Sequence, residues 1–391
     1  MARIPDVQVF GRRLGPAPPL PWRDGNRFRL LNDGTEFYTR MLEAIGTASD
    51  HVLLEMYLVE SGDVSDRFIA ALVSAVSRGV RVAALFDAFG ALGLHAEDRR
   101  RLTDGGVELR FYNVLGWRKR LGNLLRDHRK LLLVDGAVAF VGGAGLTDLF
   151  AGERPADAWR DLMVEIQGPV VADWQCVFAA TWRKTGGAPA PQSEPLPGLP
   201  DGVPGRVATS AGWHYSELSR SVVEHIHSAR RRAWVTSAYF VPSRRFRKAL
   251  RKAARRGVDV RLLMPGPKTD HPVVRHAARR FFGKMLYNDV RIFEFQPRVL
   301  HAKMVLCDDW VSIGSSNLDR YSFKWNLEAN QEIDDPGFAG LAAAVFERDC
   351  EQSEELHVRA WPRRGRINRL WETIAGALDR TLERWRRPRL P

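Results

Sequence analysis

The residues Asp127-His-Arg-Lys-Leu-Leu-Leu-Val-Asp135 and Leu300-His-Ala-Lys-Met-Val-Leu-Cys-Asp308 share one pattern, HxKxxxxD. The chain has 391 residues, of which 10 are His, 9 are Lys and 26 are Asp. A random chain of this composition would contain about 0.015 such matches, so two are not accidental. The apolar residues that follow each Lys predict a short buried strand.

The rest of the chain repeats around these two motifs. Three further pairs of segments match in the same order, namely 52–59 with 234–241, 78–86 with 256–264, and 107–112 with 290–295. Segments 52–59 and 234–241 each follow a helix-like stretch. Segments 78–86 and 256–264 each predict a helix end capped by Gly, followed by a buried strand. Alternating helices and strands predict an α/β architecture in each half.

A linker composition separates the repeats. Residues 185–205 hold six prolines and five glycines, which is typical of a linker. The predicted organisation is an extended N-terminal arm at 1–21, a first lobe at 22–184, this linker, a second lobe at 206–350, and a basic amphipathic tail at 351–391.

The chain is strongly basic, with 59 Lys and Arg against 46 Asp and Glu and a formal net charge of +13. This excess points to a polyanionic partner, either a nucleic acid or an anionic lipid surface. The sequence contains no run of 18 apolar residues, so a membrane-spanning helix is not expected. The N-terminus does not show the pattern of a signal peptide. Three widely spaced cysteines fit neither a disulfide scaffold nor a metal site.

Two His-Lys pairs suit phosphodiester chemistry. In a strand, the His and Lys of each pair point to the same face, and a pseudo-twofold axis between the repeats would bring both pairs together. The ammonium groups would neutralise the phosphoryl oxygens. One imidazole would attack phosphorus, and the other would protonate the departing alcohol and deprotonate the incoming one. No cofactor and no metal are expected, because the lysines supply the positive charge.

With the segments Gly142-Gly-Ala-Gly145 and Gly314-Ser-Ser-Asn317 after the motifs, the sequence resembles the phospholipase D superfamily. It is most similar to the cardiolipin synthase B group, and the resemblance runs from about residue 22 to 350. It implies two repeated phospholipase D-like α-β-α sandwich lobes, related by a pseudo-twofold axis, with the active site at their interface. The catalytic residues that it implies are His128, Lys130, Asp135, His301, Lys303 and Asp308.

The resemblance also implies roles for residues outside the motifs. Glu328 corresponds to a carboxylate that orients His301, and Asp161 is the expected counterpart in the first half. Ser315 and Asn317 correspond to small polar residues that line the phosphate site. The first half departs from this pattern, since it has Gly143 and Gly145 at the equivalent positions. Backbone N–H groups of a Gly-rich turn are expected to substitute in part for the missing side chains.

Two segments are candidates for contact with lipid. Residues 115–126 mix leucines with the candidate membrane-docking residues Trp117, Arg118, Lys119 and Arg120, just before the first motif. Residues 366–387 have the apolar spacing of a basic amphipathic helix with tryptophans, which fits either a membrane surface or packing on the second lobe.

These features predict a cardiolipin synthase that transfers a phosphatidyl group to phosphatidylglycerol through a phosphohistidine and releases glycerol, or ethanolamine from a phosphatidylethanolamine donor. Its expected partners are anionic phospholipids, including cardiolipin, and a membrane surface, with no nucleic acid. The expected location is peripheral, on the cytoplasmic face of the bacterial inner membrane. One alternative is a phospholipase D-type phosphodiesterase or nuclease, which the positive charge permits. Another is a binding module without activity, which the two intact His-Lys pairs oppose.

Overall fold

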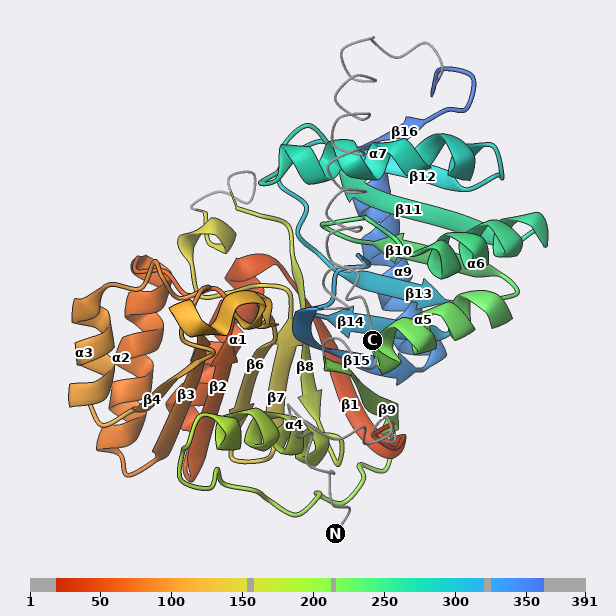
Figure 1. Ribbon diagram of the computed structural model, residues 1–391. Coiled ribbons are helices and arrows are strands. Elements are labelled where there is room, and N and C mark those ends of the chain that lie inside the picture. The colour runs from red at the N-terminus through yellow and green to blue at the C-terminus, as the bar shows by residue number, and fades with distance from the viewer. Residues whose placement is uncertain (1–18, 153–157, 212–215, 320–324, 362–391) are drawn as a thin grey trace, which may run out of the picture.

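A computed structural model describes residues 19–152, 158–211, 216–319 and 325–361. In this part of the chain, one continuous sheet of 16 strands runs through both lobes (Figure 1). The strand order is β16-β12-β11-β10-β13-β14-β15-β9-β1-β8-β7-β6-β2-β3-β4, with the short strand β5 attached to β15. The prediction of two repeated α/β lobes is confirmed.

The elements of the first lobe are β1 (Arg23–Asn32), α1 (Asp33–Thr47), β2 (His51–Met56), α2 (Asp63–Ser77), β3 (Arg81–Asp87), α3 (Ala96–Asp104), β4 (Glu108–Tyr112), the 3-10 helix η1 (Trp117–Leu124), β5 (Arg126–Asp127), β6 (Lys130–Val134), β7 (Val138–Gly142), the 3-10 helix η2 (Asp148–Phe150), β8 (Leu162–Gln167) and α4 (Val171–Lys184). Those of the second lobe are β9 (Val203–Ala211), α5 (Glu217–Ser228), β10 (Arg232–Thr236), α6 (Arg244–Arg255), β11 (Asp259–Pro265), α7 (Pro272–Leu286), β12 (Arg291–Phe295), β13 (Met304–Cys307), β14 (Trp310–Gly314), β15 (Asn326–Asp334), α9 (Pro336–Glu351) and β16 (Ser353–Leu356).

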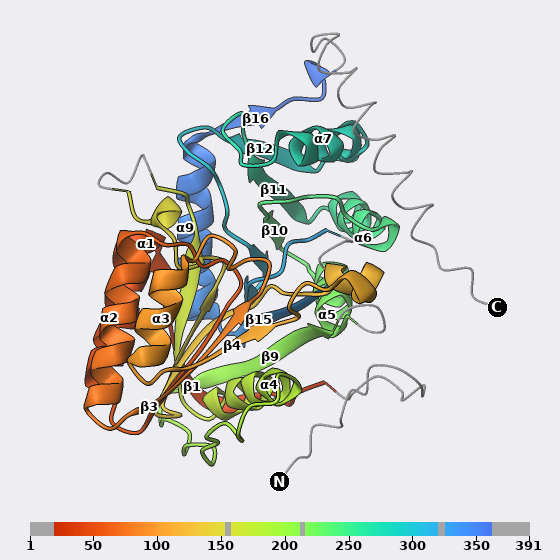
Figure 2. The same ribbon diagram turned by 60° about the vertical axis from the view of Figure 1, so that its left-hand side comes forward.

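Strands β6, β7, β13 and β14, which follow the two motifs, are buried along most of their length and are largely apolar for that reason. Helices α1 to α3 cover one face of the first lobe, and α5 to α7 cover one face of the second (Figures 1 and 2). Helices α4 and α9 cover the opposite face, where a single hydrophobic core includes residues of both lobes. The Nε1–H of Trp174 on α4 donates to the Oε1 of Gln331 on β15 at 2.9 Å, so a buried hydrogen bond also joins the lobes.

The repeat holds in detail at the helix ends. Gly79 follows α2 at φ +90°, and Gly257 follows α6 at φ +87°. This left-handed conformation favours glycine and ends a helix, as the sequence predicts. One residue after each glycine, a largely buried strand begins, β3 or β11.

The lobe boundaries differ from the prediction at two places. Strand β9 begins at Val203, inside the segment 185–205 predicted as a linker. Strand β16 pairs with β12 and forms the edge of the sheet, and Trp361 packs on Phe282 with ring centroids 5.9 Å apart. The second lobe therefore continues past residue 350. The predicted helix at 366–387 and residues 1–18 of the predicted arm lie outside the described residues.

Candidate active site

The two lobes exchange backbone hydrogen bonds where each motif begins. Strand β5 pairs with β15 of the second lobe, and the amide of His128 donates to the carbonyl oxygen of Leu327 at 3.0 Å. In the pseudo-symmetric contact, the amide of His301 donates to the carbonyl oxygen of Arg160 at 2.8 Å. Each acceptor residue directly precedes an acidic residue in the sequence. Each histidine is therefore fixed next to a carboxylate of the other lobe.

The histidine–carboxylate pairs are crossed between the lobes. The Nδ1 of His128 lies 3.0 Å from Glu328, and the Nδ1 of His301 lies 2.6 Å from the Oδ2 of Asp161. The sequence-based prediction that Glu328 orients His301, with Asp161 as its counterpart for His128, is wrong. The reason is that β5 leaves its own sheet neighbours and pairs with β15, while Arg160 pairs with Leu300.

Both imidazoles are set up to react through Nε2. A carboxylate at Nδ1 accepts the Nδ1–H bond and fixes the tautomer, which leaves Nε2 for chemistry. Burial lowers the pKa of His301 to about 4, with Lys303 adding to this effect and Asp161 opposing it. Burial also lowers the pKa of His128, against the opposing charge of Glu328. In the free enzyme both shifts favour the neutral imidazole, the form that a nucleophile needs. The histidine that acts as the acid must be protonated when substrate is bound, and the negative charge of the phosphodiester favours that protonation.

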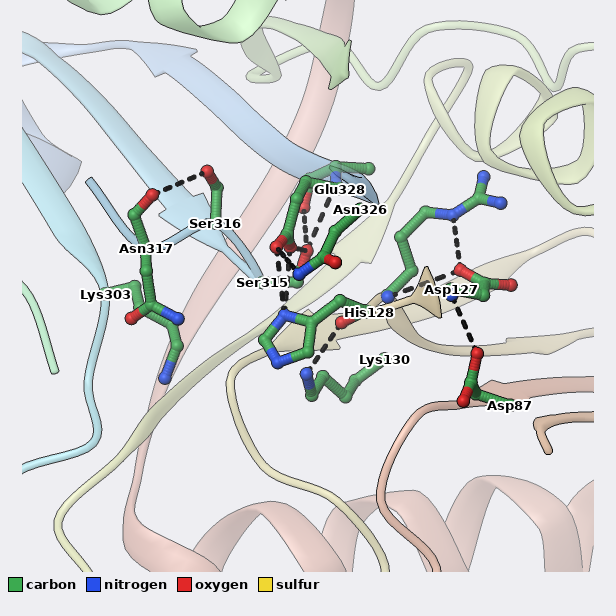
Figure 3. Close-up of polar contacts among 12 residues, drawn as sticks. Asp87, Asp127, His128, Lys130, Lys303, Ser315, Ser316, Asn317, Asn326 and Glu328 are labelled. Atoms are coloured by element: carbon green, nitrogen blue, oxygen red, sulfur yellow. Dashed lines mark hydrogen bonds and ion pairs between the residues drawn. The ribbon is translucent and has the colours of Figure 1, made fainter. Parts of the chain in front are cut away.

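The two lysines of the motifs are buried beside the imidazoles. The Nζ of Lys130 donates to the carbonyl oxygen of His128 at 2.6 Å (Figure 3). The Nζ of Lys303 lies 2.9 Å from Nδ1 and 3.1 Å from Nε2 of His301. Burial lowers the pKa of Lys130 to about 7 and that of Lys303 to about 8, although neighbouring carboxylates oppose the shifts. A bound phosphate would restore both charges, because it supplies the anion that the buried ammonium groups need.

Both carboxylates are ionised in this site. Burial raises the pKa of Glu328, but His128 and Lys130 outweigh it, and the net pKa is below the ordinary value. The same balance with Lys303 and His301 lowers the pKa of Asp161. In the free site, the two carboxylates therefore offset the charge of the two ammonium groups, and a bound phosphodiester adds a further negative charge.

Aromatic rings line the site, and sequence reasoning missed them. Tyr57 lies 4.6 Å from the ring of His128 between centroids, and Tyr239 lies 6.3 Å from that of His301. These tyrosines occupy the same position in the matched segments 52–59 and 234–241, a signal that could have identified them. Around His301, two further rings lie at 5.4 and 5.5 Å, those of Phe150 and Trp159.

Each histidine, with its lysine and its carboxylate, forms one half of the site, called a half-site below. Ser315 follows Gly314 beside one of them, whereas Gly143 follows Gly142 beside the other, and this difference has a steric reason. The Oγ of Ser315 donates to the Oε2 of Glu328 at 2.5 Å, in the half-site of His128. At the equivalent Gly143, an added Cβ would lie 2.5 Å from both carboxylate oxygens of Asp161. Aspartate is one methylene shorter than glutamate, so its carboxylate lies nearer the strand and occupies the space of a serine side chain. Glycine with aspartate and serine with glutamate are therefore two solutions to one packing problem.

The asparagine position is also asymmetric. Asn317 is buried, and its Oδ1 has no hydrogen-bond partner among the residues that the structure describes. An added Cβ at the equivalent Gly145 would lie 2.4 Å from the carbonyl oxygen of Leu58, so this half-site has no room for an asparagine. Only the second lobe contributes the amide side chain predicted from the sequence at this position.

The last residue of each motif does not reach the site. Asp135 and Asp308 lie past the far ends of β6 and β13, about 17 Å along the strand from Lys130 in the first case. Asp135 accepts the amide N–H groups of residues 49–51 at 2.9 Å, and Asp308 accepts those of residues 230–232 at 2.9–3.0 Å. The prediction that Asp135 and Asp308 are catalytic is wrong, because both carboxylates anchor the start of a neighbouring strand.

Asp135→Asn should therefore lower stability and spare catalysis. An amide cannot accept three N–H bonds with the strength of a carboxylate, so unfolding in urea should become easier by about 1–3 kcal/mol. The kcat of the folded fraction should stay within about twofold of the wild type. A large loss of kcat at unchanged stability would contradict this structural role.

The candidate membrane-docking residues lie on η1, and the two whose side chains the structure describes are not among the residues that contact the histidine of either motif. Trp117 is 101% exposed, and Lys119 is exposed on the same 3-10 helix, η1. The side chains of Arg118 and Arg120 lie outside the described residues. In the part of the chain described, no group of three or more His, Cys, Asp or Glu side chains is placed to hold a metal, and no helix is long and apolar enough to cross a bilayer.

Comparison with known proteins identifies the family of the chain. The family model described as "Cardiolipin synthase, PLD-like domain" matches residues 41–182 and 222–350, which carry one motif each. The chain belongs to this family. It is similar to cardiolipin synthase B of Escherichia coli strain K12, with 34% identity over 366 residues that cover 87% of this chain and 86% of the relative. It is also similar to cardiolipin synthase A of Pseudomonas putida strain KT2440, with 36% identity over 91% of this chain and 75% of the relative.

Solved structures support the fold of this family member. Phosphatidylserine synthase of Haemophilus influenzae superposes with a TM-score of 0.67 at 15% identity, covering 91% of this chain and 93% of that one. Polyphosphate kinase of Porphyromonas gingivalis superposes with a TM-score of 0.58 at 15% identity over 85% of this chain and 49% of the other. The family membership makes the chain an enzyme of phospholipid biosynthesis, a phosphatidyltransferase of the phospholipase D type.

Proposed function

We propose that this enzyme makes cardiolipin by transferring a phosphatidyl group to phosphatidylglycerol. The observation that carries the proposal is the crossed arrangement, in which the Nδ1 atom of each histidine faces a carboxylate of the other lobe. Two such groups, with a lysine beside each, are what a two-step displacement at phosphorus requires.

In the first step, the Nε2 of one histidine attacks phosphorus, and the bond to the head-group oxygen breaks. The other histidine supplies a proton to that oxygen, and the alcohol leaves. In the second step, this second histidine takes the proton from a hydroxyl of phosphatidylglycerol. That oxygen attacks the phosphohistidine, the P–N bond breaks, and cardiolipin forms. Glycerol is the alcohol released from a phosphatidylglycerol donor, and ethanolamine the one released from phosphatidylethanolamine.

The lysines supply the charge that the transition state needs. Lys130 and Lys303 stabilise the nonbridging oxygens, each from its own half-site. We place the enzyme on the membrane as a peripheral protein, on the cytoplasmic face of a bacterial inner membrane. Support comes from the exposed Trp117 and Lys119 next to the first motif.

Mass spectrometry of lipids tests this function. Purified protein is incubated with phosphatidylglycerol vesicles, with and without phosphatidylethanolamine, and the lipids and released alcohols are identified. Cardiolipin should form together with an equal amount of glycerol, or of ethanolamine if that lipid is the donor. Formation of phosphatidic acid alone would instead identify a hydrolase.

The pH profile should be limited on its alkaline side by the lysines. Their pKa values of about 7 and 8 mean that the ammonium charges are present at lower pH and are lost as the pH rises. Because kcat/KM reports groups of the free enzyme, it should fall with an apparent pKa between about 7 and 8. A soluble short-chain phosphodiester avoids effects of pH on vesicles. A value of kcat/KM that stays constant up to pH 9.5 would contradict the prediction.

Docking through η1 predicts a strong salt effect and a specific charge-reversal effect. Each basic residue near an anionic surface contributes about 1 kcal/mol, which salt screens. The combined variant Arg118→Glu, Lys119→Glu and Arg120→Glu should reduce sedimentation with phosphatidylglycerol vesicles by more than about tenfold at low salt. Turnover of a soluble phosphodiester should be unchanged. Vesicle binding equal to that of the wild type would exclude η1 as the docking element.

A further inference from the structure

A second loop of the first lobe stands beside η1 at the same sheet edge. Strands β3 and β4 are parallel neighbours that end at Asp87 and Tyr112, and the amide of Ala88 donates to the carbonyl oxygen of Tyr112 at 3.0 Å. The loops that follow, 88–94 and 113–125, therefore leave the sheet next to each other. The strand β6 starts at this same edge, because Lys130 pairs with Met56 at the end of β2.

Exposed large apolar side chains concentrate on these two loops. Six of the twelve in the described part of the chain lie here, although the loops hold only 20 residues. Scattered exposed apolar residues are normal, whereas a concentration of them marks an interaction site. The six, with their exposed fractions, are Phe89 (50%), Leu92 (60%), Val114 (58%), Leu115 (47%), Trp117 (101%) and Leu124 (38%).

Loop 113–125 has its two asparagine side chains turned inward. The Nδ2 of Asn113 donates to the carbonyl oxygens of Gly122 and Leu125 at 2.8 and 2.7 Å. Asn123 and Gly116 exchange two hydrogen bonds across the loop, at 3.1 and 2.9 Å. The amide side chains thus satisfy the backbone while the apolar side chains face outward, which is the reverse of a loop made for water.

Asp87 ties both loops to the first motif. Its buried carboxylate accepts the amide N–H groups of Phe89 and Gly90 at 2.9 and 3.0 Å. It also accepts a hydrogen bond from the guanidinium of Arg126 at 3.2 Å. A further one comes from the backbone amide of Asp127 at 2.9 Å, directly before His128 (Figure 3). Arg126 in turn donates to the carbonyl oxygen of Asn113 at 2.8 Å. The apolar surface therefore has a fixed position relative to the reacting imidazole.

We propose that loops 88–94 and 113–125 form one membrane-docking face, which inserts among the acyl chains of an anionic phospholipid bilayer. Phe89 and Leu92 then form a second insertion point beside Trp117. The charge pattern favours this occupant, because residues 113–125 contain three basic residues and no acidic one, and residues 88–94 contain no charge. The proposal rests on the proposed function and adds to it a lipid contact outside the segment 115–126.

The double variant Phe89→Ser and Leu92→Ser tests this second insertion point. Binding to phosphatidylglycerol vesicles is measured by sedimentation, together with turnover of those vesicles and of a soluble short-chain phosphodiester. Loss of two apolar insertions should weaken vesicle binding by at least about tenfold. Turnover of vesicles should fall in parallel, while turnover of the soluble substrate should stay within about twofold.

The matched control is Leu196→Ser with Leu341→Ser, at positions 41% and 58% exposed that lie outside these loops. This control should bind vesicles like the wild type. The proposal is overturned if the loop variant binds as well as the wild type, if the control loses binding equally, or if the loop variant only dissociates a dimer in lipid-free solution. A wild type that binds vesicles through these loops but forms no cardiolipin would refute the proposed function and leave the docking face intact.

Discussion

His128→Ala and His301→Ala should each lower the rate of phosphatidyl transfer by at least about 10⁴-fold. Loss of a nucleophile or of its acid–base partner removes a step that the rest of the site cannot replace. The matched control is His227→Ala, an exposed histidine at the end of α5, which should leave the rate unchanged. Lipid products are counted by mass spectrometry after equal exposure to phosphatidylglycerol vesicles.

A substrate with a better leaving group separates the two roles. Nitrophenolate leaves without a proton, so the variant that lacks only the acid should still release one equivalent of nitrophenol from a nitrophenyl phosphodiester. The variant that lacks the nucleophile should release none. If either alanine variant turned over natural lipid at a near-normal rate, the paired mechanism would be wrong.

The second large effect concerns the crossed carboxylates. Glu328→Gln and Asp161→Asn should each lower kcat/KM by about 10²–10⁴-fold, because an amide does not stabilise the imidazolium and favours the wrong tautomer. Activity alone does not test which carboxylate serves which histidine. Glu328→Gln should act on the half-site of His128, and Asp161→Asn on that of His301.

Nitrogen NMR of ¹⁵N-histidine-labelled protein reads this assignment directly. The Nδ1 signal of His128 should shift in the Glu328 variant and stay in place in the Asp161 variant. The signal of His301 should do the reverse, so that each variant is the control for the other. Shifts in the opposite sense would mean that each carboxylate serves the histidine of its own lobe.

The double motif carried most of what the sequence could predict. Local pattern was enough for the strands after each Lys and for the glycine ends of α2 and α6, since periodicity and capping depend on neighbouring residues. Local pattern could not predict which carboxylate contacts which histidine. The prediction placed Glu328 with His301, which lies 27 residues away in the chain, whereas β5 crosses to β15 and brings His128 to Glu328.

Two other differences have equally physical causes. Asp135 and Asp308 belong to the motif, but a strand separates them from its first residues, so sequence proximity did not become proximity in the site. From the sequence, backbone N–H groups were expected to substitute in part for the side chains missing at Gly143 and Gly145. The structure gives a steric reason for Gly143, because an added Cβ would lie 2.5 Å from the carboxylate oxygens of Asp161, a relation between two neighbouring segments that spacing alone does not reveal.

The covalent step is the central claim, and isolation of the phosphoenzyme tests it most directly. The enzyme is mixed with phosphatidylglycerol labelled at phosphorus, denatured in alkali within the first turnover, and digested, and the labelled peptide is identified by mass spectrometry. The label should lie on His128 or His301 alone, and alanine at that position should abolish it. Cardiolipin formed in the same time without any labelled histidine would contradict the mechanism.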